Sequence, residues 1–321
     1  MIAPYLPRLL ALCCAVFFAV HFAAGLMVSA AGPAAVRAAR RLCPRSAARR
    51  LLWLRLLPTA LGLFAVAGIC LPSYLWLEPA DIAEEIGPGC LLAAALAVAL
   101  WTISLVRGLR AGIRSIRHTR ESGRLSRLWT LPGTGLQVCI VDTPAPLLAL
   151  VGLYGSRVIV SNRVMQAFAA PQLLAALHHE EAHRVSRDNM KRLLMLLTPG
   201  LLPGFHGFRT IERGWARFTE WAADDDAVRG DADQSLTLAA ALVCVARMGA
   251  TPAPSPLGAS FLGNGGEISA RVERLLNPTP PAPVRRPRNA PAAAIAVAAA
   301  GCLLHPATLQ WAHRTLERLI H

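Results

Sequence analysis

Two histidines four residues apart, with a glutamate directly after the first, are the residues of this chain best suited to chemistry. They are His179, Glu180 and His183, in the pattern H-E-x-x-H. Residues 172–187 are predicted to be helical, and because positions i and i+4 of a helix lie on one face, both imidazoles can bind one metal ion. Glu180 lies one residue further round, where it can take a proton from a metal-bound water. The pattern therefore predicts a zinc peptidase with Glu180 as its catalytic base.

A catalytic zinc site needs a third protein ligand and one open position. Glu220 is the best candidate because it lies on a separate predicted helix, at about 208–228, and can approach from another direction. Glu212 is an alternative ligand. Asp224 shares a helical face with Glu220 and is expected to orient a ligand histidine by accepting its other ring N–H. Asp188 is expected either to support the site in the same way or to cap the following helix.

The elements that hold these residues are predicted to be anchored in a membrane. Of the 321 residues, 54% are hydrophobic and 16% are charged, whereas about 25% are charged in a typical soluble domain. Three apolar stretches are long enough to cross a bilayer, at about 9–31, 56–77 and 90–106. A fourth membrane span is expected at about 290–304, and an apolar helix at about 190–205 is expected either to lie partly in the membrane or to pack on the helix bundle, without crossing the membrane.

The arginines predict the orientation of the chain in the membrane. The net charge is +14, and seven arginines lie in each of the segments 32–55 and 107–127, whereas the segment 78–85 is acidic. Because basic residues favour the cytoplasmic side, the N-terminus is expected outside and segment 109–289 inside, in the inner membrane of a bacterium. A cleaved signal peptide in place of the first span is the less favoured alternative, since cleavage would leave the first basic segment outside. Membrane topology accounts for the positive charge, and no direct nucleic-acid contact is expected.

The predicted fold class is mainly α, with polytopic transmembrane helices and a cytoplasmic α+β zincin-like metallopeptidase domain that contains a small β-sheet. Short β-branched runs predict strands at 136–142 and 157–161, with a third at about 147–153. The predicted units are 1–108 (three spans with a basic cytoplasmic loop at 32–55), 109–289 (the peptidase domain) and 290–321 (a fourth span and a short tail).

These features together resemble the BlaR/MecR family of bacterial membrane zinc metallopeptidases. The matching residues are the H-E-x-x-H motif, Arg187-Asp188, Glu220, Asp224 and, more loosely, the segment Arg271–Leu275, within a resemblance over roughly residues 90–305. The resemblance implies cleavage of a cytoplasmic winged-helix repressor. Roughly 16 residues follow the fourth candidate span, so an extracellular penicillin-binding sensor is not expected. Ala223, where the family often has cysteine, favours the related CAAX-prenyl and HtpX-type membrane peptidases as an alternative.

The expected function is an integral-membrane endopeptidase with Zn²⁺ as cofactor, cleaving a cytoplasmic or membrane-proximal protein. Zinc lowers the pKa of a bound water from about 15.7 to roughly 7, so that Glu180 can take its proton and pass it to the leaving amine. The strand at 158–161 is a candidate for pairing with the substrate backbone. Membrane lipid is an expected partner, and whether the chain forms a homo-oligomer stays open. A zinc-bound signalling scaffold without catalysis and a membrane bundle with a chance motif both remain open.

Overall fold

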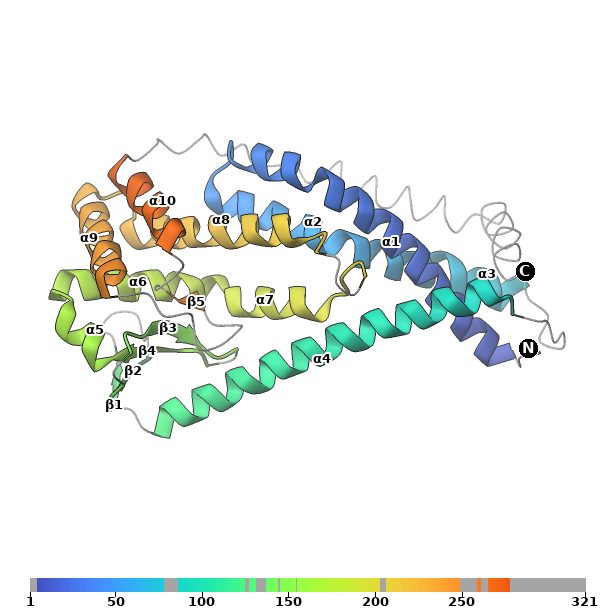
Figure 1. The fold of residues 1–321 in the computed structure, drawn as a ribbon, viewed down its shortest axis with the longest axis horizontal. Coiled ribbons are helices and arrows are strands. Elements are labelled where there is room, and N and C mark those ends of the chain that lie inside the picture. Colours follow the sequence, from blue (N-terminus) through green and yellow to red (C-terminus); the bar gives the residue numbers. More distant parts are fainter. Residues whose placement is uncertain are drawn as a thin grey trace.

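A computed structural model of the chain describes residues 5–77, 86–124, 127–130, 137–143, 145–153, 155–202, 206–248, 259–260 and 265–277. The protein is mainly helical with a small mixed sheet at one end (Figure 1). Within the described residues, three helices are long and apolar enough to cross a membrane, which confirms that part of the predicted fold: Tyr5–Ala39, Pro44–Trp76 and Pro88–Glu121. The predicted fourth span, at about 290–304, and the acidic segment 78–85 lie outside the described residues.

The membrane-type helices extend well beyond the predicted spans. They are α1 (Tyr5–Ala39), α2 (Pro44–Ala65), which continues through the π-helical turn Val66–Cys70 into α3 (Leu71–Leu77), and α4 (Pro88–Arg124). The segment 32–55, expected as a loop, is therefore mostly helical, with a short break at residues 40–43. It is rich in alanine, leucine and arginine, which all favour helix, and Ala47 and Leu51 are buried by packing against other helices.

The sheet has the strand order β1-β2-β4-β3-β5. Its strands are β1 (Arg127–Thr130), β2 (Gln137–Val141), β3 (Leu148–Val151), β4 (Arg157–Ser161) and β5 (Ala259–Ser260). β2 and β4 are parallel, while all other neighbours are antiparallel. The three predicted strands are present, but β1 and β5 were not predicted.

β4 cannot bind a substrate by strand addition, and that prediction was wrong. It lies between β2 and β3, with Val158 paired to Val138 on one side and to Leu150 on the other. Residues 158–161 are all buried. A continuous apolar run is typical of an interior strand, whose backbone groups are already paired.

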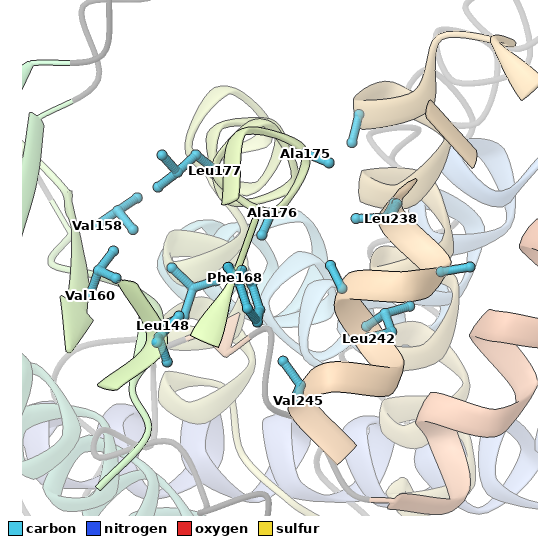
Figure 2. Close-up of a cluster of buried hydrophobic side chains, with 14 of the residues drawn as sticks. Leu148, Val158, Val160, Phe168, Ala175, Ala176, Leu177, Leu238, Leu242 and Val245 are labelled. Atoms are coloured by element: carbon cyan, nitrogen blue, oxygen red, sulfur yellow. The ribbon is translucent and has the colours of Figure 1, made fainter. Parts of the chain in front are cut away.

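One face of the sheet packs against the helix that carries the H-E-x-x-H motif. This helix, α6 (Ala170–Ser186), follows the short helix α5 (Asn162–Ala167) and also contacts α9 (Ala232–Met248). Figure 2 shows the cluster: Leu148, Val158 and Val160 come from the sheet, Ala175, Ala176 and Leu177 from α6, and Leu238, Leu242 and Val245 from α9. The motif helix is thus held on a rigid apolar layer.

Helices α7 (Asp188–Leu197) and α8 (Arg209–Val228) form a hairpin that reaches towards the membrane-type helices (Figure 1). The predicted helix at 190–205 is shorter than expected, because Thr198 is extended and Pro199 follows it. A residue before proline disfavours the helical conformation. His21 Nε2 on α1 lies 2.8 Å from the carbonyl oxygen of Gly200, which places the tip of the hairpin against the first candidate span.

Arg55 of α2 fastens the same hairpin at a second point. Its side chain is 1% exposed; Nε donates to Glu212 Oε1 at 2.7 Å and Nη2 donates to the carbonyl oxygen of Met195 at 3.1 Å. The guanidinium also stacks over the Phe208 ring, 4.4 Å from its centroid. One buried cation therefore ties α2 to both arms of the hairpin.

Because α7 packs closely against α4, we predict that alanine substitutions at two glycines of α4 affect stability differently. A Cβ at Gly108 would overlap Leu197 Cδ2 and lie 2.7 Å from its Cγ, whereas a Cβ at Gly112 would meet no described atom within 4 Å. We expect Gly108→Ala to destabilise the protein by about 1–3 kcal/mol, since an overpacked contact forces neighbours apart. Gly112→Ala should be neutral or stabilising by up to about 1 kcal/mol.

The midpoint of thermal unfolding in detergent measures this difference. Equal midpoints for the two alanine variants would show that α7 does not pack on α4 at Gly108.

Candidate metal centre

The chain enters and leaves the motif helix in ways that fix its position. Gln172 Oε1 accepts a hydrogen bond from the backbone N–H of Ala169 at 3.1 Å, which satisfies one of the free amides at the start of α6. α6 ends at Ser186, and Arg187 adopts a left-handed conformation (φ 55°, ψ 43°) before α7 begins at Asp188. This single-residue corner turns Asp188 back towards α6.

Three side chains converge at the centre of the site: His179 and His183 from α6 and Glu220 from α8. The two Nε2 atoms are 3.1 Å apart; Glu220 Oε2 lies 3.4 Å from His179 Nε2, and Glu220 Oε1 lies 3.6 Å from His183 Nε2. Both histidines are buried, and Glu220 is 16% exposed. This group could hold a metal ion.

The spacing fits the metal for which the residue types are suited. Four ligands held about 2.0–2.1 Å from a tetrahedral zinc ion lie about 3.3 Å from one another. The measured separations of 3.1, 3.4 and 3.6 Å lie around that value. Glu220 Oε2 is buried and lies 3.4 Å from His179 Nε2 and 3.1 Å from Arg271 Nη1, so a cationic group already lies next to this oxygen.

A carboxylate behind each imidazole orients the histidine pair. Asp224 Oδ1 lies 3.0 Å from His179 Nδ1, and Asp188 Oδ2 lies 2.8 Å from His183 Nδ1. With Nδ1–H donated to the acid, the Nε2 lone pair of each ring faces the centre, an arrangement common around metal-ligating histidines. The tautomer is assigned here from the hydrogen-bond network.

The electrostatics of the centre favour a positive charge between the three side chains. Burial opposes ionisation of Glu220, but the charge of His183 and the hydrogen bonds from both histidines outweigh it and hold the Glu220 pKa well below its usual range. Burial also opposes protonation of His183; the charge of Glu220 and the hydrogen bond to Asp188 prevail and raise its pKa to about 10. A metal ion can supply the positive charge that the proton otherwise provides.

Glu180 is buried beside the ligands, and the sheet fixes its position. Its Oε2 accepts a hydrogen bond from the backbone N–H of Leu150 on β3 at 2.9 Å. Burial raises the Glu180 pKa, although the nearby charges of His179 and His183 act in the opposite direction. A raised pKa brings the carboxylate closer to the range in which a group accepts and returns protons near neutral pH.

Arg271 also belongs to the site, although the sequence analysis named it only within the segment that resembles BlaR/MecR peptidases and assigned it no role. It lies on α10 (Gly265–Leu276), is 3% exposed and binds Asp224 with two parallel hydrogen bonds, Nε to Oδ2 at 2.9 Å and Nη2 to Oδ1 at 2.6 Å. Its Nη1 lies 3.1 Å from Glu220 Oε2. Arg271 lies on the apolar face of its helix, three residues after Ile268 and four before Leu275. A charged residue at such a position is the sequence feature that could have indicated its burial in the site.

The guanidinium of Arg271 compensates the acids of the site. Burial opposes ionisation of Asp224, yet the charge of Arg271 and the hydrogen bond from His179 lower the Asp224 pKa to about 2. Asp224 is therefore ionised and available to accept the His179 ring N–H. A buried charge left without such a partner would be costly.

The structure brings together all six residues singled out for the site: His179, Glu180, His183, Glu220, Asp224 and Asp188. Asp188 makes no capping bond at the start of α7; its second oxygen instead accepts from Lys191 Nζ at 2.8 Å. Glu212 lies elsewhere, paired with Arg55.

Comparison of the chain with protein-family models and with curated proteins gives no match. The chemistry of the centre is therefore inferred from its geometry.

The role of Arg271 predicts that metal affinity falls when its planar guanidinium is replaced. Arg271→Lys keeps the charge but cannot make two parallel bonds to Asp224, so we expect metal affinity to fall about 10- to 100-fold, as when other supporting residues of metal sites are lost. Arg274→Lys is the matched control, because Arg274 lies on the same helix and pairs with the more exposed Asp225. Chelator competition on the purified protein measures both, and equal affinities would contradict the role given to Arg271.

The raised pKa of His183 predicts how metal binding depends on pH. Because this pKa is about 10 instead of 6.5, a proton has to leave whenever a metal takes Nε2 at any pH below about 10. Apparent zinc affinity should therefore increase with pH, by about tenfold per unit for one released proton. Chelator competition between about pH 6 and pH 9 tests this, and an affinity independent of pH would rule out His183 as a ligand.

Proposed function

We propose that this protein is an integral-membrane, zinc-dependent endopeptidase that cleaves a cytoplasmic or membrane-proximal protein. The observation that carries the proposal is the convergence of His179, His183 and Glu220, with Glu180 fixed beside them. Two histidines and one glutamate form a donor set used by catalytic zinc sites, which leave the fourth position for water or substrate. The buried carboxylate next to the ligands is the group that such a site needs as a base.

Each residue of the site would have a separate role in the reaction. His179, His183 and Glu220 would hold the ion, which would polarise the scissile carbonyl and make a water molecule more acidic. Glu180 would accept the proton of the attacking water and deliver it to the leaving amine. The Leu150 N–H would hold Glu180 in place during both transfers. Asp224 and Asp188 would keep both imidazoles in the tautomer that binds metal.

The proposal includes the topology inferred from the arginines, with the N-terminus outside and the metal centre on the cytoplasmic side of a bacterial inner membrane. The contact of the α7–α8 hairpin with the first candidate span supports a site close to the membrane surface. The resemblance to BlaR/MecR peptidases makes a winged-helix repressor the first candidate substrate.

Replacing the base tests the proposal most directly. Glu180→Gln keeps the size of the side chain but cannot take a proton, so we expect about a 10²- to 10⁴-fold loss of cleavage with metal still bound. Glu181→Gln is the matched control; Glu181 is the next residue of α6 and pairs with Arg184 near the surface. The readouts are cleavage of candidate repressors and unfolded proteins by the detergent-solubilised enzyme, and zinc per chain by mass spectrometry.

Full cleavage by the Glu180→Gln protein would overturn the mechanism. A wild-type protein that binds zinc without cleaving any of these substrates would favour the scaffold alternative, and one without stoichiometric metal would favour a chance motif.

A further inference from the structure

We propose that a basic cavity beside the metal centre binds the phosphate of an anionic phospholipid headgroup. The cavity has a volume of about 210 Å³ and lies between the start of α2, the α6–α7 corner and α8. The residues that carry the argument are Arg45, Arg49, Leu52, Asp188, Lys191 and Trp215.

The charges that line this cavity leave an excess of positive charge. Arg45, Arg49 and Lys191 face a single acid, Asp188. The carboxylate of Asp188 is already shared by His183 Nδ1 and Lys191 Nζ, each at 2.8 Å. Arg45 pairs with Asp226, whereas Arg49 is exposed and forms no ion pair or hydrogen bond with the described residues. Cations on two different elements around one concavity suit a phosphate group.

The position along α2 identifies the phosphate as that of a lipid. Leu52 lines the cavity, and the apolar stretch of the second candidate span begins at Leu56, four residues or about 6 Å further along the helix. The headgroup layer on each side of a bilayer is about 5–7 Å thick. With Pro44–Trp76 in a membrane, the cavity therefore lies at headgroup depth.

The walls of the cavity also match the amphipathic part of a lipid. Leu52 is half-buried and contributes apolar surface next to the three cations, and it packs against the core cluster that contains the buried Trp215. A glycerophosphate group can thus place its phosphate on Arg49 and Lys191 and its glycerol against the apolar wall.

A headgroup in this cavity would lie next to a residue that supports the metal centre. Lys191 holds Asp188, and Asp188 orients His183. An effect of lipid on catalysis rests on the proposed function, whereas binding of the lipid does not. The test therefore measures binding, in a Glu180→Gln background where no turnover is needed.

Titration of the full-length protein in non-ionic detergent with short-chain phosphatidylglycerol, phosphatidylcholine or inorganic phosphate tests the proposal. The Arg45→Gln/Arg49→Gln protein should bind phosphatidylglycerol about tenfold more weakly or worse. Arg40→Gln/Arg41→Gln is the matched control, since it removes two exposed arginines of the same basic segment that do not line the cavity. The control should bind phosphatidylglycerol as the parent protein does.

Three results would overturn the proposal: equal losses in the two double variants, phosphatidylcholine binding as tight as that of phosphatidylglycerol, or inorganic phosphate binding as tight as that of the lipid. The first would mean diffuse attraction, the second an apolar groove and the third a site for soluble anions. Arg49→Gln alone covers the case in which loss of the Arg45–Asp226 pair disturbs folding, and it should still weaken lipid binding about fivefold.

Discussion

Buried charges that compensate one another hold the helices around the candidate metal centre in a single arrangement. Glu220, Asp224 and Arg271 lie together with two histidines in a space with little solvent. Each of these groups alone would be costly to bury, and each is tolerated because the others supply opposite charge or hydrogen bonds. The partners come from α6, α7, α8 and α10, so these four helices must pack in one arrangement for the cluster to be satisfied.

The α7–α8 hairpin links this cluster to the membrane-type helices. Its base carries Asp188, Glu220 and Asp224, while its far end contacts His21 and Arg55. The same two helices thus position half of the candidate metal centre and make polar contacts with α1 and α2. Displacement of the spans relative to one another would be transmitted to the carboxylates through two continuous helices, with no loop in between to absorb it.

The sequence was sufficient where a contact depends on helical spacing. His179 and His183 on one face, and Glu220 with Asp224 on another helix, follow from an offset of four residues. It was insufficient where a contact joins distant segments: Arg271 reaches Asp224 from 47 positions away, and a charge in an amphipathic helix is ordinarily read as solvated. The interior place of β4 and the presence of β1 and β5 depend on strand pairings that no local pattern specifies.

The left-handed conformation of Arg187 fixes the number of residues that can separate His183 from Asp188. Most connections between helices tolerate insertions because they cross solvent. Here one residue separates α6 from α7, and its conformation alone returns Asp188 to the ring of His183. Adding one residue would rotate the start of the next helix by about 100° and carry the carboxylate off the imidazole. The functional unit of this protein therefore extends over ten residues, from His179 to Asp188. The five residues of H-E-x-x-H alone would not reproduce it in another protein.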